Sequence, residues 1–593
     1  MNDIRKVKIA IVDSGVRLDH HAIIGKQPQL IRYTGLENGE GNCGHGTAIF
    51  NIISKAEKFA DIINFQITNK DGEISEDELI GCLCEIRDNY DVDIINLSLG
   101  LSFCDDITRL RNICDELSAK GIIIVSAFDN MGALSYPAVF ENVIGVTSVD
   151  ICRKIDDFIV FEDNVINIGA NGNMQRLAWN KPDYIISDGN SFACAHTAVQ
   201  IARFMSDGVR TFSEIIDKFK EIALQIISPP HPSMINSPLF QIERAVLFPF
   251  NKEMHSLIRF HNLLSFDISG VYDIRESSHV GSTTNHIMKD DVSSFVIQNI
   301  ENIDWFSFDT IILGNFPTHN SERLSKIRTD IVNKAISFNK NIFSFDDLRR
   351  QYNYERLYCP TVDLNDLPPS RMGKLYRISK PVIGVYGTSS RQGKFTLQLK
   401  LRERFLENRY SIGQIGTEPS AQLFGIDYVY PMGYNNSVYI DGHDAISYIN
   451  HCMNSLCQNH CDIILTGSQS SVLPCDVGNL AMFPMRQYSF LMGTQPDCII
   501  LCINPYDDYE YIERSISFLE SCVDGKVISL CMFPMKYRNE QVGMYMKKDP
   551  LSRMEFENLK KSLQKNFLIP VYHLGDENDI DLLFNNIVDF FHE

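Results

Sequence analysis

Short β-rich runs alternate with amphipathic stretches along this chain, and the alternation constrains its fold more than any other feature. The β-type runs of the first third are 7–12, 62–68, 92–97, 122–125 and 143–146. Helical periodicity covers 76–89, 107–120 and 192–205. Such alternation predicts an α/β fold, with a parallel sheet covered by helices on both faces. In such sheets functional residues lie at the carboxyl ends of the strands and on adjoining helices.

The length of the chain and a segment rich in proline and serine predict the domain organisation. The 593 residues suffice for roughly two to four domains of about 150 residues each. A segment rich in proline and serine at 227–238 marks a linker. Strand–helix alternation resumes after it, and again after Lys380-Pro381. We therefore predict three α/β domains, at 1–245, 246–378 and 379–593.

Charge and composition exclude several classes of partner. The chain is 44% apolar and carries a net charge of −20, which argues against general nucleic-acid binding because phosphate contacts need clustered lysine and arginine. The N-terminus lacks the apolar segment of a secretory signal, and there is no run of about 18 apolar residues that would span a membrane. We expect a cytoplasmic protein without nucleic-acid or membrane partners. The oligomeric state is left open.

The cysteines indicate reduced thiols. Sixteen are scattered through a long chain without a signal peptide, unlike the disulfide framework of a small secreted protein. The densest group of potential ligands has no common zinc spacing, so no metal site is expected. That group is His451, Cys452, Cys457, His460 and Cys461.

Three separated polar residues match the needs of acyl transfer. Asp13 ends an apolar run, His45 opens the segment Gly-His-Gly-Thr-Ala, and Ser191 precedes the helical stretch at 192–205. Cleaving an amide needs a nucleophile, a base, a group that fixes the tautomer of the base, and donors for the oxyanion. Ser191, His45 and Asp13 would fill the first three roles. Free amides at a helix N-terminus would favour the negative charge. Taken singly, each residue is more often a cap or a turn residue.

The order Asp, His, Ser and the three local contexts resemble the subtilisin-like serine peptidases. This resemblance implies a peptide or protein substrate, and proteolysis without a cofactor. It also implies that Asn130 supplies the oxyanion amide. The edge at Ser98, Leu99 and Gly100 would pair with extended substrate. Phe128 stands where relatives have a small residue, which implies a narrowed or reshaped primary pocket.

The chain departs from that family at two positions near the site and at its start. Ala195 replaces a proline and Asp129 replaces a glycine, which puts loop geometry and rate in question. The first strand begins at residue 7, so the N-terminal pro-domain of secreted relatives is expected to be absent. Activity must then be restrained in another way.

A glycine- and lysine-containing loop follows a second apolar strand at 382–386. Gly387, Thr388, Gly393, Lys394 and Thr396 precede a helical stretch, and backbone amides with a lysine at a helix N-terminus bind phosphate. The strict P-loop places four residues between its glycines, whereas five lie here, and Thr396 follows Lys394 by two positions. The alternative is a tight βα turn with a solvated lysine.

This loop resembles that of dethiobiotin-synthetase-like enzymes. More closely, residues 250–593 resemble a bacterial family with a Rossmann-like half and a P-loop half, some members of which are described as D-glutamate N-acetyltransferases. The resemblance implies that Lys394 and Thr396 hold phosphates and a cation, that Gln414 and Gln469 lie near the ligand, and that Asp462 is near the cation. Gln469 is displaced by one position from the usual pattern, so acetyl transfer is not carried over. The ligand expected is ATP, GTP or acetyl-coenzyme A, with Mg²⁺.

Three functional hypotheses follow. The first is a cytoplasmic endopeptidase fused to a ligand-binding P-loop module, for example one that trims the leader of a ribosomally made peptide. The second is a P-loop acyltransferase or ligase whose front domain recognises peptide. The third is a nucleotide-gated protease that acts as a sensor.

Overall fold

The structure, a computed structural model, describes residues 6–26, 28–33, 44–56, 58–68, 74–130, 134–162, 164–228, 238, 240–288, 294–316, 321–368, 373–433, 437–459, 461–474, 478, 483–537 and 548–592. The chain forms two compact units, one of residues 1–230 with 369–374 and one of 231–368 with 375–593. The predicted α/β class is confirmed, because both units are built on largely parallel sheets. Within the described ranges no helix has the length and apolarity needed to cross a membrane.

The N-terminal unit contains a nine-stranded sheet of order β11-β7-β8-β6-β5-β4-β1-β3-β2. Only the β7–β8 pair is antiparallel. The strands of this unit, including the separate β9–β10 hairpin, are β1 (Val7–Asp13), β2 (Gln29–Arg32), β3 (Ala60–Gln66), β4 (Ile94–Leu97), β5 (Ile123–Ala127), β6 (Val143–Ser148), β7 (Phe158–Phe161), β8 (Ile168–Ala170), β9 (Gln175–Ala178), β10 (Tyr184–Ser187) and β11 (Gln225–Ile227).

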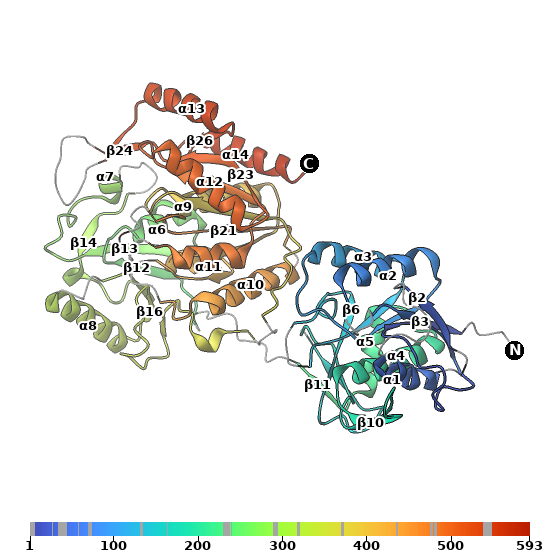
Figure 1. Cartoon of the computed structure of the whole chain (residues 1–593). Helices are drawn as coiled ribbons and strands as arrows, with labels where there is room; N and C mark the ends of the chain where they lie inside the picture. The colour runs from blue at the N-terminus through green and yellow to red at the C-terminus, as the bar shows by residue number, and fades with distance from the viewer. Residues whose placement is uncertain are drawn as a thin grey trace. The chain divides into compact units, whose positions relative to one another are not determined.

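Helices cover both faces of this sheet (Figure 1). Buried apolar side chains of α1 (Gly44–Ile53), α4 (Asn190–Ser206) and α5 (Phe212–Ile222) pack on one face. Those of α2 (Glu76–Asn89) and α3 (Ile107–Ala119) pack on the other. Parallel strands buried on both faces explain the near-continuous apolar runs of the sequence.

The first sheet of the C-terminal unit is entirely parallel and has the order β14-β13-β12-β15-β16-β17. In chain order this is 3-2-1-4-5-6, the arrangement of a Rossmann-like sheet. Its strand β12 begins at Arg244, so the boundary predicted at residue 245 falls inside this strand. The elements are β12 (Arg244–Phe248), α6 (Met254–Arg259), η2 (His261–Leu263), β13 (Asp267–Asp273), α7 (Thr284–Met288), β14 (Ile297–Asn299), β15 (Thr310–Leu313), α8 (Glu322–Ser337), β16 (Asn341–Ser344) and β17 (Leu357–Tyr358).

The second sheet of this unit has seven parallel strands in the order β20-β19-β21-β18-β22-β23-β26. Helices α9 and α14 pack on one face, and α10, α11, α12 and α13 on the other. The elements are β18 (Val382–Gly387), α9 (Lys394–Glu407), β19 (Ile412–Gly416), η6 (Pro419–Phe424), β20 (Tyr428–Val429), α10 (Gly442–Gln458), β21 (Ile463–Gly467), α11 (Met485–Thr494), β22 (Cys498–Ile503), α12 (Tyr509–Cys522), β23 (Lys526–Met532), β24 (Met535–Tyr537), β25 (Lys548–Pro550), α13 (Arg553–Phe567), β26 (Val571–His573) and α14 (Glu577–Phe590).

The two sheets of the C-terminal unit share one hydrophobic cluster. Phe250 and Leu257 of the Rossmann-like part belong to the same buried group as Leu399 and Phe424 of the P-loop part. A continuous core of this kind explains why the two parts form one compact unit, although the sequence predicts two domains.

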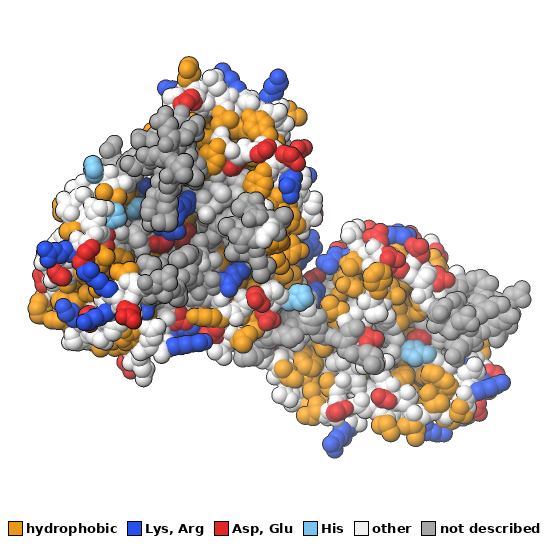
Figure 2. All heavy atoms as spheres, turned by 60° about the vertical axis from the view of Figure 1, so that its left-hand side comes forward, with side chains coloured by type: hydrophobic (Ala, Val, Ile, Leu, Met, Phe, Trp, Pro, Cys, Tyr) orange, Lys and Arg blue, Asp and Glu red, His pale blue; other side chains and the backbone are white. Residues whose placement is uncertain are grey.

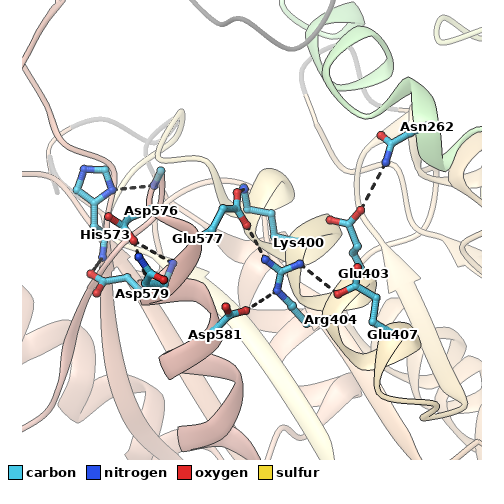
Figure 3. A network of polar contacts seen from close by, with 12 residues as sticks. Asn262, Lys400, Glu403, Arg404, Glu407, His573, Asp576, Glu577, Asp579 and Asp581 are labelled. Carbon is cyan, nitrogen blue, oxygen red and sulfur yellow. Dashed lines mark hydrogen bonds and ion pairs between the residues drawn. The ribbon is translucent and has the colours of Figure 1, made fainter.

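A network of charged side chains fixes α9, whose N-terminus carries the glycine-lysine loop (Figure 3). Arg404 binds Glu577 at 2.7 Å and Asp581 at 2.6 Å, and Lys400 also pairs with Glu577. These bonds join α9 to α14. Asn262 of η2 approaches Glu403 at 3.5 Å, which adds a polar contact with the Rossmann-like part.

Candidate active sites

A histidine–carboxylate pair lies at the carboxyl end of β1. Asp13 ends this strand, and His45 is the second residue of α1. The Nδ1 atom of His45 lies 2.9 Å and 3.0 Å from the two carboxylate oxygens of Asp13. The side chain of Asp13 is 5% exposed and that of His45 is 34% exposed. Because the carboxylate accepts from Nδ1, Nε2 is left as the proton acceptor.

The residues around the pair hold its geometry and shift the pKa of His45. Ser14 donates its backbone N–H to Asp13 Oδ1 at 2.7 Å, and its hydroxyl accepts from the Gly46 N–H at 3.0 Å. A Cβ atom on Gly46 would lie 2.1 Å from the Gly15 carbonyl oxygen, so only glycine permits this close approach. Burial lowers the pKa of His45, but the charge of Asp13 and its hydrogen bond raise it, and the net shift is upward.

Ser191 lies near the N-terminus of α4, with its hydroxyl directed at a backbone carbonyl. Its Oγ donates to the Ser98 carbonyl at 2.8 Å, and the Ser98 hydroxyl donates to the Ser191 carbonyl at 2.9 Å. The hydrogen bonds of the described residues do not include one between Ser191 and His45. The structure thus joins Asp13 to His45 and holds the Ser191 hydroxyl in another bond. Attack requires that bond to be released, at a cost of about 1 kcal/mol.

The side-chain oxygen of Asn130 is held by a hydrogen bond, whereas its nitrogen has none among the described residues. Its Oδ1 accepts from the backbone N–H of Asn190 at 2.8 Å. A Cβ atom built on Gly189 would lie 3.7 Å from Nδ2, so Nδ2 lies beside the turn that leads into Ser191. Within the described residues no hydrogen bond occupies Nδ2. An exposed amide donor in this place can bind an oxyanion.

Asn190 is a residue that the sequence analysis missed. Its side-chain Nδ2 donates to the carbonyls of Phe128 at 3.0 Å and Asp129 at 3.1 Å. Its Oδ1 accepts from the backbone N–H of Ser148 at 2.7 Å. The side chain therefore ties the loop that carries Asn130 to the start of α4. The only available signal was its position directly before Ser191.

The segment expected to pair with substrate follows β4. Ser98 is buried, Leu99 is half-buried and Gly100 is exposed. A Cβ atom on Gly100 would lie 2.9 Å from Ser135 Cβ. The next residue, Leu101, forms an isolated antiparallel bridge with Tyr136. The carbonyls of Ser98 and Leu99 already accept hydrogen bonds from the hydroxyls of Ser191 and Ser126, so β-type pairing of this segment with a peptide stays a prediction.

Phe128 lies in the core. Its exposure is 4%, and a Cβ atom on Gly145 would lie 2.6 Å from its ring. The missing side chain at Gly145 therefore makes room for the ring. A buried ring can reshape a neighbouring pocket through the residues that it supports, so the expected effect of Phe128 on the primary pocket stays a prediction.

A second site is a cavity of about 620 Å³ in the C-terminal unit. The glycine-lysine loop and α6 both contribute to its wall, so it lies between the P-loop and the Rossmann-like part of one compact unit. Cavities of this size hold small ligands and cofactors. Its lining residues include Lys252, Glu253, His255, Arg259, Asn315, Arg391, Gly393, Lys394, Thr396, Glu418 and Gln469.

Several predicted ligand residues do not line this cavity. Gly387 ends β18 and Thr388 is buried, and the Thr388 hydroxyl accepts from Gln392 Nε2 at 2.6 Å. Gln414 is fully buried in β19, and its Oε1 accepts from Arg402 at 3.3 Å. Asp462 precedes β21 and accepts from the Ser411 N–H at 2.7 Å, which places it at the amino end of the strand, away from the P-loop.

Glu418 is the acidic residue that the sequence analysis missed. It follows β19 and lines the cavity with Lys394 and Gln469. Burial raises the pKa of Glu418, whereas its hydrogen bond to Gln469 lowers it. Burial lowers the pKa of Lys394 to about 8, and its Nζ donates to the Ser389 carbonyl at 2.7 Å. A bound anionic ligand would raise the pKa of this lysine again.

Two family models match separate parts of the chain. Residues 5–213 match the subtilase family, and residues 370–581 match the P-loop domain of a family of unknown function, DUF1611. The subtilisin-like protease SBT6.1 of Arabidopsis thaliana is 31% identical over 156 residues, which are 24% of this chain but 15% of that protein. The major intracellular serine protease of Bacillus subtilis (strain 168) is 23% identical over 248 residues, 38% of this chain and 75% of that protein.

A solved structure was also found to be similar. It is a DUF1611 family protein from Anabaena variabilis, 13% identical, which covers 59% of this chain and all of that protein with a TM-score of 0.44.

Proposed function

We propose a function from the premise that this chain carries a subtilisin-like serine endopeptidase domain and a DUF1611 P-loop domain. The protein is a cytoplasmic peptide-processing endopeptidase whose C-terminal unit binds a phosphate-containing ligand. The observation that carries the peptidase reaction is the Asp13–His45 pair beside the helix that bears Ser191.

The geometry supports the following acyl transfer. The Ser191 hydroxyl leaves the Ser98 carbonyl, its proton passes to Nε2 of His45, and Oγ forms a bond to the carbonyl carbon of the substrate. Asp13 holds the imidazolium that results. The oxyanion accepts from Asn130 Nδ2 and from free amides at the start of α4. His45 then protonates the leaving amine, and a water activated by the same imidazole releases the acyl group.

The cavity supports the proposed ligand. Lys252, Arg259, Arg391 and Lys394 contribute positive charge to its lining, as expected for a site that takes several phosphates. If the ligand carries Mg²⁺, Thr396 and Glu418 have the oxygen atoms that would hold it. ATP, GTP and acetyl-coenzyme A share this phosphate chemistry, and calorimetry with each would separate them.

Two observations support the cytoplasmic assignment. Every cysteine within the described residues is free, as is usual in reducing compartments. The similar protein from Bacillus subtilis is named as an intracellular protease. The natural substrate is proposed to be a precursor peptide with an extended leader, since backbone pairing at Ser98–Gly100 favours an extended chain.

Cleavage of candidate precursors, followed by mass spectrometry, tests the proposal. The full chain should release a fragment at one site, and Ser191→Ala should release none. The matched control is Ser213→Ala on the exposed start of α5, which should cleave like the wild type. An enzyme that cleaves casein but leaves every candidate precursor intact would contradict the dedicated role and keep the peptidase assignment.

A further inference from the structure

A second histidine–carboxylate pair lies in the C-terminal unit. Asp273 is the last residue of β13, and its side chain is 6% exposed, whereas the His279 imidazole is 35% exposed. Asp273 Oδ2 accepts from His279 Nδ1 at 3.0 Å, and Oδ1 accepts from the Ile274 N–H at 2.8 Å. Both oxygens of this buried carboxylate are therefore hydrogen-bonded. The pair leaves Nε2 of His279 as a proton acceptor.

The loop that carries His279 is held in place on both sides. The His279 carbonyl accepts from the Ser282 N–H at 2.9 Å, and Gly281 donates to Ile297 of β14 at 2.9 Å. Ile297 in turn donates to the Ser282 carbonyl at 2.9 Å. These bonds fix the imidazole by backbone contacts, a property that a general base requires.

The pair is one aromatic ring away from the phosphate cavity. The ring of Phe250 lies 5.4 Å from that of His279 and 5.2 Å from that of His255, which lines the cavity. Phe250 also donates its N–H to the Tyr272 carbonyl at 2.9 Å, which joins it to the end of β13. Figure 2 shows basic, acidic and histidine side chains at the surface of this unit. Ligands of open α/β sheets bind at this carboxyl edge.

We propose that His279 is the general base of a second, group-transfer site, with Asp273 as its positioning residue. The inference rests on the phosphate-binding role proposed above and names the donor as a nucleoside triphosphate in the cavity. The acceptor is a small molecule with a hydroxyl group that approaches the partly exposed imidazole of His279 from the solvent side, because the ring of Phe250 is buried. An imidazole base suits a hydroxyl acceptor, whereas a carboxylate acceptor is already ionised and needs none.

The proposed step transfers the γ-phosphoryl group of the nucleoside triphosphate to the acceptor oxygen. The O–H bond of the acceptor breaks and its proton goes to Nε2 of His279. The acceptor oxygen forms a bond to the γ-phosphorus, and the bond from that phosphorus to the β–γ bridging oxygen breaks. The electron pair of that bond leaves with the nucleoside diphosphate. The partly exposed imidazolium then releases the proton to solvent.

Two conservative variants separate this role from a purely structural one. His279→Gln keeps an N–H that can donate to Asp273 but has no base. Asp273→Asn presents an amide N–H to Nδ1, which favours the tautomer with a proton on Nε2. His286→Gln is the matched control, because His286 is exposed on the adjacent helix α7.

The test uses the full chain with ATP, and with water or glycerol as the acceptor. Calorimetry measures the Kd for ATP, and product formation measures turnover. Both His279→Gln and Asp273→Asn should lower turnover at least about 100-fold with the Kd unchanged within twofold. His286→Gln should change neither. Diethyl pyrocarbonate should modify His279 of the wild type faster than His279 of Asp273→Asn.

The outcomes distinguish this site from the phosphate-binding role. ATP binding with turnover that is unaffected by His279→Gln, or ATP binding without any turnover, would overturn the group-transfer site and leave the phosphate site standing. A wild type that binds neither ATP nor GTP would overturn the nucleotide donor and with it the group-transfer site, and one that also fails to bind acetyl-coenzyme A would overturn the phosphate-binding role as well. Equal modification of His279 with and without the Asp273 carboxylate would overturn the positioning role.

Discussion

The two histidine–carboxylate pairs are built alike but have different neighbours. In each, a buried aspartate ends a parallel strand, accepts the next backbone N–H, and binds Nδ1 of a histidine that is about one third exposed. The first pair lies near a serine at a helix N-terminus and an amide donor. The second lies near an aromatic ring and a basic cavity. The pair supplies a proton acceptor, and its surroundings decide the reaction.

The largest expected effect separates the two pairs. Asp13→Asn should lower the kcat of peptide hydrolysis by about 10⁴-fold, because the amide imposes the wrong tautomer on His45. Asp273→Asn should leave peptide hydrolysis within twofold of the wild type. The rate of hydrolysis of a chromogenic peptide by each full-length variant is the measurement. Equal losses in both variants would contradict the separate roles.

The amide donor should have the next largest effect. Asn130→Ala should lower kcat by about 10²- to 10³-fold with little change in KM, because Nδ2 acts on the oxyanion that forms in the transition state. Asn190→Ala should lower kcat less, through the loop that it holds. Steady-state kinetics on one peptide checks both variants. A change confined to KM would assign Asn130 to ground-state binding.

Lys394 provides a test of the second region. Lys394→Met should weaken ATP binding about 10- to 100-fold, as expected for loss of a hydrogen bond to a charged group, and should leave peptide hydrolysis unchanged. The pKa of Lys394 is lowered to about 8 in the free protein. The protonated lysine binds phosphate, so affinity should fall as pH rises above about 8. Calorimetry at several pH values would contradict this if affinity were constant from pH 7 to 9.

The acid limb of peptide hydrolysis tests the charge environment of the first pair. The pKa of His45 is shifted upward overall, and the base acts when it is deprotonated. The kcat/KM should therefore rise with pH along a limb centred above about 6.5, the ordinary histidine value. Asp13→Asn should move the remaining limb downward. A wild-type limb centred below pH 6 would contradict the effect of Asp13.

The smallest effect concerns the support of the P-loop helix. Arg404→Ala removes the bonds from α9 to Glu577 and Asp581, whose side chains are more than half exposed, so the loss should be about 1 kcal/mol of unfolding free energy. Lys565→Ala, on an exposed position of α13, is the control. Denaturant unfolding measures both, and equal midpoints would show that the network adds no stability.

Local sequence patterns predicted the bounds of a helix well where a capping residue defines its N-terminus. The helix predicted at 76–89 matches α2, whose N-terminus is fixed by a capping box between Ser75 and Glu78. The Asp13–His45 contact was also predictable, because the resemblance places both residues at one edge of the sheet. The direction of the Ser191 hydroxyl was not, since it depends on a hydrogen bond to Ser98, which is distant in sequence.

The features that the sequence could not predict depend on contacts between residues that are distant in the chain. The contact of Asp273 with His279 depends on the fold of the intervening loop. Glu418 has no motif of its own and becomes a cavity residue only because β19 lies two strands from β18. The single C-terminal unit depends on a cluster that joins residues of both sheets, which periodicity along one segment cannot reveal.

Covalent labelling with a fluorophosphonate, followed by peptide mapping, tests the central claim most directly. The wild type should be labelled at Ser191 alone, Asp13→Asn should be labelled far more slowly, and Asp273→Asn should be labelled at the wild-type rate. A label on another serine, or no dependence on Asp13, would contradict the assignment of the first pair and Ser191 as the peptidase centre.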